Sequence, residues 1–281
     1  DDRSIALRAY LDGSFGTAGI KLQDFRAGIN SDEQLFDLKL QGGNIVAVGR
    51  FSEIGTPNVD FAVASFNSGT GALGILPNGD GLTSFYTFRQ DGAAALSIQA
   101  DGNWVVSGST GYALPGFEGT ETNFALARYI STTGALDPTF ADDGLVTTDF
   151  SSLSGSTDTA AATVVQADGK ILVAGFTRLG FGASQGVVSR YNTDGKLDPT
   201  FGANGQITIG AFNSNGITGI TLGAATGNPA TQPIYVTGTV LNQITFRNDI
   251  AVASITPVGE FNTGFGTDGV AFAEFPQDTT A

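Results

Sequence analysis

Apolar residues along this chain come in short runs that alternate or cluster with β-branched residues, and turn residues separate the runs. The segment 124–176 contains four of them: FALARY, GLVTTDF, AAATVVQ and KILVAGF. Asp168-Gly169 stands between the last two runs, and Asp101-Gly102 holds the same place one period earlier. Because an Asp-Gly pair between apolar runs is a strong hairpin signal, we predict antiparallel strand pairs and no helix in the repeating unit.

The pattern returns with a period of about 62 residues. A glycine opens one strand type, a phenylalanine closes it, and another glycine ends a second strand type. These series are Gly19, Gly81, Gly144, Gly205 and Gly269; Phe25, Phe88, Phe150, Phe212 and Phe275; and Gly49, Gly108, Gly175 and Gly238. One small sheet buries too little apolar surface alone, so repeated sheets must pack face to face. The repeat predicts an all-β fold, a β-propeller-like array of four-stranded antiparallel blades.

Strand counting predicts one domain with four full blades and a half blade. The half blade is residues 1–29, and the full blades are residues 30–88, 89–150, 151–212 and 213–281. The half blade lacks two inner strands, so sheet edges would stay open. Open edges are templates for strand addition, and we therefore expect other protein chains as partners, with self-assembly among the outcomes.

Several stretches resemble a known repeat. They read LDGSFGTAG (11–19), LDPTFADDG (136–144), LDPTFGANG (197–205) and QADGKILVAG (166–175). The stretches are similar to the delta-60 repeat of exported bacterial proteins, and the strand order is similar to that of NHL-type β-propeller blades. The resemblance implies a repeat scaffold that is secreted or held at the bacterial cell surface, with its signal peptide removed, and it implies no shared reaction.

The amino-acid composition excludes several kinds of catalytic site and binding partner. The 281 residues include no histidine and no cysteine, which excludes Ser-His-Asp triads, thiol nucleophiles and imidazole or thiolate zinc sites. A net charge of −14 would repel a phosphate backbone, so nucleic acid is not an expected partner. No apolar run approaches the roughly 18 residues of a membrane helix, so no membrane span is expected.

Acidic turn residues are the candidate metal ligands. We predict that Asp12, Asp137 and Asp198, in the LDxxF turns, cap their own turns, and calcium binding is the alternative reading. Asp142 and Asp143 form the best local acidic pair and are the calcium candidates. No EF-hand loop accompanies them, so we expect no cofactor beyond that calcium ion.

Variable loops at 51–60, 110–123, 177–186 and 241–249 are predicted to emerge on one face, where a rigid scaffold presents binding residues. Aromatic and charged side chains there would suit a sugar ring, and the alternative is that they pack their own loops. Trp104 is expected in the core, and Arg128 and Arg190 are expected either to extend between blades or to pair with acidic turns, and not to bind a substrate. The candidate ligand-binding residues are Tyr112, Phe117, Glu118, Glu121, Arg178, Phe181, Phe246 and Arg247.

These patterns predict a non-catalytic scaffold, extracellular or on the cell surface, that mediates protein assembly or binding and is not an enzyme. Two alternatives stay open. The first is a lectin-like module that binds glycans through the loop face. The second is a carboxylate-metal hydrolase or lyase, since some propellers of related blade order resemble lactonases or lyases.

Overall fold

The computed structural model describes most of the chain as strands. The described residues are 14–17, 31–55, 59–75, 77, 81–83, 90–113, 120–150, 155–180, 182–224, 228–242 and 247–273. They form sixteen strands in antiparallel sheets and a short 3₁₀-helix, η2 (Pro229–Thr231). The all-β prediction is therefore confirmed for this part of the chain. No helix within it is long and apolar enough to cross a membrane.

Consecutive strands pair in chain order, four to a set. The first set is β1 (Ser31–Gln41), β2 (Asn44–Glu53), β3 (Val59–Asn67) and β4 (Leu82–Thr83). The second is β5 (Gly92–Ile98), β6 (Trp104–Ala113), β7 (Thr120–Tyr129) and β8 (Leu145–Thr148). The third is β9 (Ser156–Val165), β10 (Ile171–Leu179), β11 (Gln185–Tyr191) and β12 (Gln206–Ile209). The fourth is β13 (Ile217–Leu222), β14 (Ile234–Asn242), β15 (Arg247–Ile255) and β16 (Val270–Ala273).

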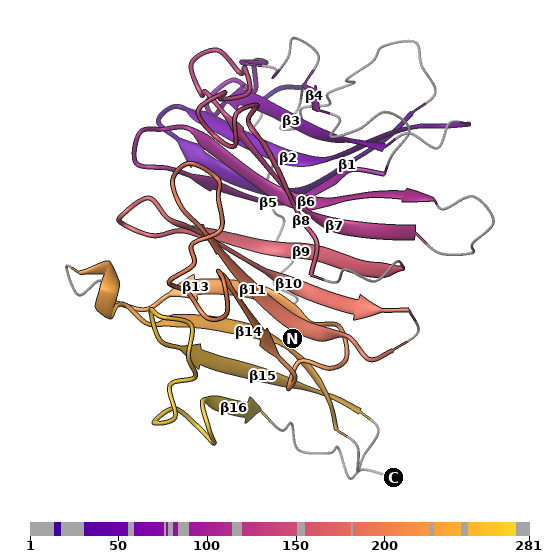
Figure 1. Ribbon diagram of the computed structural model, residues 1–281. Coiled ribbons are helices and arrows are strands. Elements are labelled where there is room, and N and C mark those ends of the chain that lie inside the picture. Colours follow the sequence, from indigo (N-terminus) through magenta and orange to yellow (C-terminus); the bar gives the residue numbers. More distant parts are fainter. Residues whose placement is uncertain are drawn as a thin grey trace, which may run out of the picture.

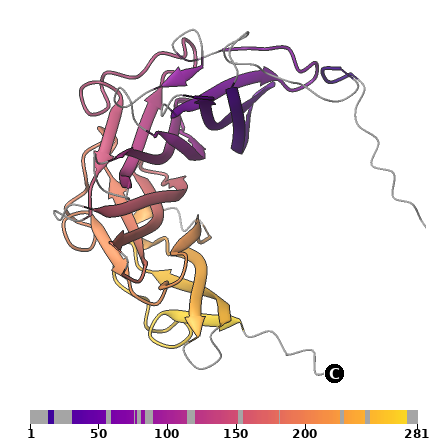
Figure 2. The same ribbon diagram turned by 90° about the vertical axis from the view of Figure 1, so that its right-hand side faces the viewer.

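The four sets, called sheets 1 to 4 below, are stacked in chain order (Figure 1). Figure 2 shows that they follow an open arc, as a propeller-like array would. A parallel pair, Thr122 opposite Thr157, joins β7 to β9, so sheets 2 and 3 share hydrogen bonds as well as a core. Most of the predicted half blade, 1–13 and 18–29, lies outside the described residues.

Neighbouring sheets share apolar cores. Val46 and Phe61 of sheet 1 pack in one cluster with Leu96 and Trp104 of sheet 2. Trp104 is buried, as predicted, and its indole Nε1 donates to Gln41 Oε1 across the two sheets at 2.6 Å. Since burial of apolar surface contributes about 25 cal/mol per Å², face-to-face stacking supplies the stability that one sheet lacks.

The Asp-Gly hairpins are confirmed, because β5 pairs with β6 and β9 pairs with β10 across them. Sheet 4 differs, since the stretch 224–238 carries two prolines and no Asp-Gly turn. Helix η2 occupies that connection, and Asn228 caps it by accepting the N–H of Ala230 at 2.9 Å.

The glycines predicted to end the second strand type lie inside the second strand of each sheet instead, and their position has a steric cause. The first strand of each sheet carries a β-bulge, and its backbone approaches the glycine closely. A Cβ on Gly175 would lie 1.9 Å from the carbonyl oxygen of Thr159, and one on Gly108 would lie 1.9 Å from that of Gly92. The periodic glycine is therefore required by the bulge opposite it.

Replacement of Gly175 by alanine should lower the free energy of unfolding by about 2–3 kcal/mol, because the new methyl group overlaps a backbone oxygen. Urea unfolding followed by circular dichroism measures this loss. Gly210→Ala is the control, since a Cβ there meets no atom within 4 Å. Equal losses in the two variants would contradict the steric explanation.

Candidate functional site

The two ends of β10 lie at opposite edges of the stack. Lys170 precedes β10 at what we call the turn edge, where the 136–144 and 197–205 motifs lie. Thr177, near the other end of β10, lies at the loop edge, where the β6–β7 and β10–β11 connections emerge (Figure 1). The polar groups at the two edges have different surroundings and different roles.

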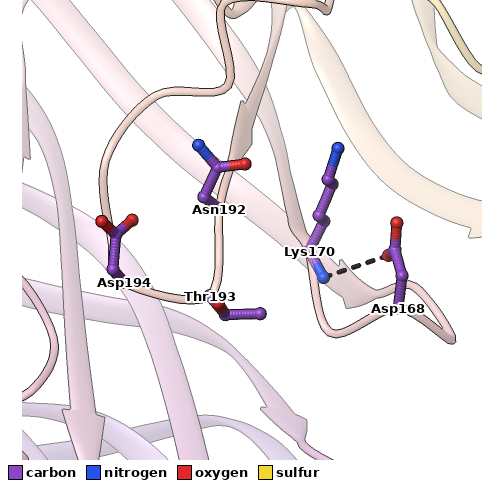
Figure 3. Close-up of a pocket in the computed structure, with 5 residues that line it drawn as sticks. All are labelled: Asp168, Lys170, Asn192, Thr193 and Asp194. Carbon is purple, nitrogen blue, oxygen red and sulfur yellow. Dashed lines mark hydrogen bonds between the residues drawn. The ribbon is translucent and has the colours of Figure 1, made fainter.

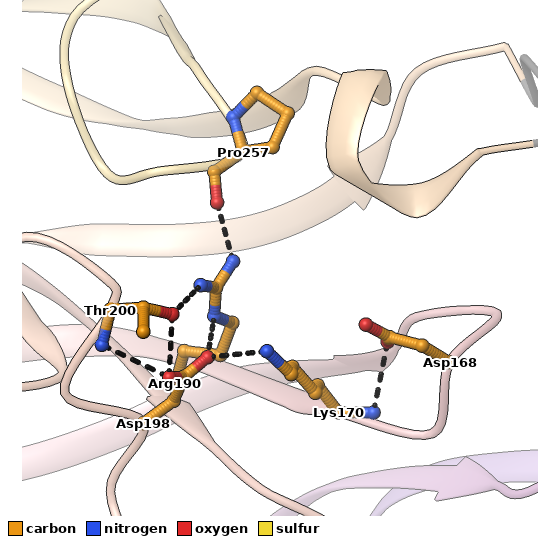
Figure 4. Close-up of polar contacts among 6 residues, drawn as sticks. All are labelled: Asp168, Lys170, Arg190, Asp198, Thr200 and Pro257. Atoms are coloured by element: carbon orange, nitrogen blue, oxygen red, sulfur yellow. Dashed lines mark hydrogen bonds and ion pairs between the residues drawn. The ribbon is translucent and has the colours of Figure 1, made fainter.

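The turn edge is built on a buried ion pair. Arg190 Nε lies 2.8 Å from Asp198 Oδ2, and Lys170 Nζ lies 2.8 Å from the same oxygen (Figure 4). Asp198 Oδ1 accepts the backbone N–H of Thr200 at 3.0 Å and its hydroxyl at 2.7 Å. Arg190 Nη1 also donates to the carbonyl of Pro257 in sheet 4, so the group ties two sheets together.

The same arrangement joins sheets 2 and 3. Arg128 Nε lies 2.9 Å from Asp137 Oδ2, and Arg128 Nη1 donates to the carbonyl of Thr193 at 2.5 Å. Each guanidinium also lies 4.6 Å from the centre of a phenylalanine ring, Phe140 for Arg128 and Phe201 for Arg190. We call this repeated group the arginine–aspartate latch: Arg128, Asp137, Thr139 and Phe140, and Arg190, Asp198, Thr200 and Phe201.

Both latch aspartates are held ionised. Burial alone would raise the pKa of both carboxyls. It is outweighed at Asp137 by the hydrogen bonds from Thr139 and by Arg128, and at Asp198 by Lys170 first, then Thr200 and Arg190. The pKa of each carboxyl is therefore lower than its ordinary value. The predicted turn caps at Asp137 and Asp198, and the predicted pairing of both arginines, are confirmed; Asp12 lies outside the described residues.

A hollow of about 410 Å³ lies beside the latch, lined by Asp168, Lys170, Asn192, Thr193 and Asp194 (Figure 3). Its carboxylates close their own turns, since Asp168 accepts the N–H of Lys170 and Asp194 that of Lys196, each at 3.2 Å. The Lys170 ammonium is directed to the latch. These groups serve the fold and present no reactive pair.

Near the loop edge, where β7 and β9 join, one buried carboxylate is influenced by the charges of two others. It belongs to Asp158 of β9, which is fully buried. Its Oδ1 accepts the Thr177 hydroxyl at 2.6 Å, and its Oδ2 accepts the N–H of Phe150 at 2.9 Å. Thr122 Oγ1 bridges the backbone N–H and carbonyl of Asp158, each at 3.1 Å. These contacts hold the carboxyl group in one orientation beneath the surface.

The other two carboxylates lie toward solvent. Half-buried Glu121 of β7 is 3.5 Å from the Gly155 N–H, and exposed Asp149, which follows β8, is 3.5 Å from the Ser156 hydroxyl. Burial is the main cause that raises the pKa of Asp158 to about 6, and the charges of Asp149 and Glu121 add to it against the hydrogen bonds from Phe150 and Thr177. We call Glu121, Asp149 and Asp158 the carboxylate cluster.

Only part of this cluster belongs to the repeat. In sheet 2, Asp91 accepts the Thr110 hydroxyl at 2.5 Å, as Asp158 does from Thr177. One period after Glu121 and Asp149, however, the chain has Ala183 and Ala211. The structural aspartate is therefore repeated, while the two outer carboxylates distinguish the junction of sheets 2 and 3 from the next one.

The predicted loop-face residues are partly brought together. Tyr112 and Glu121 are opposite each other on β6 and β7, and exposed Arg178 is opposite Thr157, the neighbour of Asp158. Arg247 begins β15 in sheet 4, away from this junction. Phe117, Glu118, Phe181 and Phe246 lie outside the described residues. The ligand role of all eight stays a prediction.

The predicted calcium pair lies on an exposed turn. Asp143 accepts the N–H of Leu145 at 2.9 Å, and Asp142 has a φ of 72°. Within the described ranges no group of three or more acidic side chains is placed to hold a metal ion. Calcium binding at Asp142 and Asp143 stays a prediction.

Comparison with known proteins finds a β-propeller family model that matches two stretches of the chain. Residues 99–140 and 166–201 match the model of a domain of unknown function, DUF5122, described as a beta-propeller. This match supports a propeller-type repeat family. It does not distinguish the delta-60 repeat in particular, which stays a prediction. A search of curated proteins finds no match.

Solved structures similar to the chain include arabinanases. A GH43 endo-arabinanase from Bacillus licheniformis is 16% identical, with a TM-score of 0.44 over 86% of this chain and 79% of that one. The native arabinanase of Bacillus subtilis is 14% identical, with a TM-score of 0.43 over 89% of this chain and 84% of that one. At such identities and TM-scores the likeness assigns no substrate to this chain.

These neighbours correct the predicted function. We expected a non-catalytic scaffold that is not an enzyme. That expectation is wrong, because these similar structures are glycoside hydrolases. The lectin-like alternative and the metal-dependent alternative do not fit them either. The physical error lay in the inference from composition. A chain without histidine and cysteine still has carboxylates for proton transfer, and the carboxylate cluster brings three of them together.

Replacement of Asp198 by asparagine should lower the free energy of unfolding by about 3 kcal/mol at pH 7, since it leaves Arg190 buried without its charge partner. Because the pKa of Asp198 is lowered on folding, this loss should shrink as pH falls below about 4. Asp194→Asn is the control, because Lys196 and Asp194 form an exposed pair at 3.7 Å. Similar losses in both variants would contradict the latch.

The Asp158 carboxyl predicts an opposite pH dependence. Its raised pKa means that the folded state binds the proton more tightly, so its contribution to stability is complete below about pH 4 and declines as pH rises through 6. Relative to Asp158→Asn, the wild type should lose up to about 3 kcal/mol across that window. Urea unfolding at several pH values measures it, and a difference that stays constant or grows would refute the assignment.

Proposed function

We propose that the chain is a glycoside hydrolase-like propeller in which Glu121 and Asp149 act as an acid–base pair on a glycosidic bond. One observation carries the proposal: these two carboxylates reach solvent beside the buried Asp158, where β7 meets β9. Glycosidic hydrolysis needs two carboxyl groups, one to protonate the leaving oxygen and one to act as base or nucleophile. It needs neither histidine, nor cysteine, nor a metal ion.

Asp158 is a positioning residue in this scheme. Its carboxyl holds the N–H of Phe150, the residue after Asp149, and thereby fixes the backbone that carries Asp149. Burial raises the pKa of the Asp158 carboxyl, and the charges of Asp149 and Glu121 add to this rise.

Substrate binding would use the same edge. Exposed Arg178 stands on β10 opposite Thr157, and its guanidinium can donate to sugar hydroxyls. Arabinan is the first polymer to test, because it is the substrate class in the names of the matched structures. Only the choice of arabinan comes from those names, and the proposed role of Glu121 and Asp149 does not depend on them.

Location and ring size are part of the proposal. A polysaccharide substrate agrees with the predicted place outside the cell. The delta-60 relationship, and a ring of four full blades with a half blade, would account for the open arc of Figure 2.

The test is release of reducing sugar from arabinan, galactan and xylan by the purified chain. Glu121→Gln and Asp149→Asn should each lower kcat/KM by about 100-fold or more, the usual loss on removing an acid or base. Asp143→Asn is the matched control, because that carboxylate is exposed and caps only its own turn. Circular dichroism checks that each variant is folded. No release from any polymer by the wild type would reject the proposal, as would full activity in both cluster variants.

A further inference from the structure

The first strand of sheet 1 presents an uncovered apolar face. Leu38 on β1 is 59% exposed, whereas Leu96 on β5 is 0% exposed. The two positions are equivalent, since Leu38 lies opposite Ala47 of β2 and Leu96 lies opposite Val106 of β6. Leu40 on the same strand is also exposed. A side chain that is core in sheet 2 is thus left in water in sheet 1.

Among the described residues on this face of sheet 1, the uncovered apolar surface is confined to β1. On the same face of sheet 1, Ala47 of β2 and Ala62, Ala64 and Phe66 of β3 are buried in one cluster. Along β1, by contrast, a groove of about 230 Å³ is lined by Leu35, Phe36, Asp37, Leu38 and Ala47. Within the part of the chain that the structure describes, this strand therefore lacks a cover about as wide as one or two strands.

The other sheets show what covers this position. The first strand of each later sheet packs against the first two strands of the sheet before it: β5 against β1 and β2, β9 against β5 and β6, and β13 against β9 and β10. Between sheets 3 and 4, Leu172 and Ala174 of β10 share a core with Ile234 and Val236 of β14. Only one face of the covering hairpin is used, since Val173 packs toward sheet 2 instead.

We infer that β1 is a docking site for a β-hairpin on another polypeptide, one with the apolar pattern of the repeat's own first two strands. The reason is that β5, β9 and β13 each pack on the first two strands of the sheet before them. β1 presents the same apolar face, and no such hairpin covers it among the described residues. The inference is independent of the proposed function, and its test measures binding and not activity.

The test uses the segment Ser156–Leu179, which is the β9–β10 hairpin, as a fluorescent peptide. A disulfide between added terminal cysteines closes the hairpin, because an isolated two-stranded hairpin is only marginally stable. Fluorescence anisotropy should show saturable binding to the chain. Leu38→Lys should weaken it at least tenfold, while Ile54→Lys, a control at 58% exposure in the turn after β2, should leave it unchanged.

Peptide variants test which face docks. Leu172→Lys should abolish binding, whereas Val173→Lys, on the opposite face, should preserve it. Hydrogen exchange on the chain should show new protection along β1 when the hairpin is present. Absent binding by the closed hairpin, or equal loss with both peptide variants, overturns the inference. Self-association of the chain that depends on Leu38 and that the hairpin does not inhibit would also overturn it, since a second copy would then be the occupant.

Discussion

The arginine–aspartate latch is the interaction on which the stacking of sheets 2 to 4 depends. Apolar surfaces between sheets attract one another without direction, so they alone do not set how one sheet is rotated on the next. The latch adds direction, because a guanidinium held by Asp198 and Thr200 within sheet 3 reaches one carbonyl, that of Pro257, in sheet 4. The aromatic ring of Phe201 beneath the guanidinium helps to keep it in place.

The carboxylate cluster and the latch show how charge is divided between the two edges. At the turn edge, cations neutralise Asp137 and Asp198 and keep them ionised. At the loop edge, Asp158 has hydroxyl and N–H partners and two further acids nearby, and its pKa rises to about 6. The same residue type is therefore held ionised at the turn edge and favoured in its protonated form at the loop edge, according to its partners.

Local sequence predicted what depends on local contacts. Asp168-Gly169 predicted a hairpin, Asp137 and Asp198 predicted caps, and Trp104 was placed in the core by its repeat position. Glu121 was among the predicted ligand-binding residues, but Asp149 and Asp158 were missed, because the three are brought near one another only by the β7–β9 junction, which no periodic pattern predicts. Asp91, just before β5, and Asp158, in β9, occupy equivalent positions of the repeat, but this similarity indicates the repeat and not the outer acids.

The acceptor of each latch is a backbone carbonyl, contributed by Thr193 in one case and Pro257 in the other. Every residue has such a carbonyl, so the turn that accepts the hydrogen bond needs no particular side chain. If one period were duplicated within the gene, the new sheet would carry its own arginine donor, and the turn of the next sheet would already supply a carbonyl acceptor. Such an array can change its number of sheets in one genetic step, without a second compensating mutation.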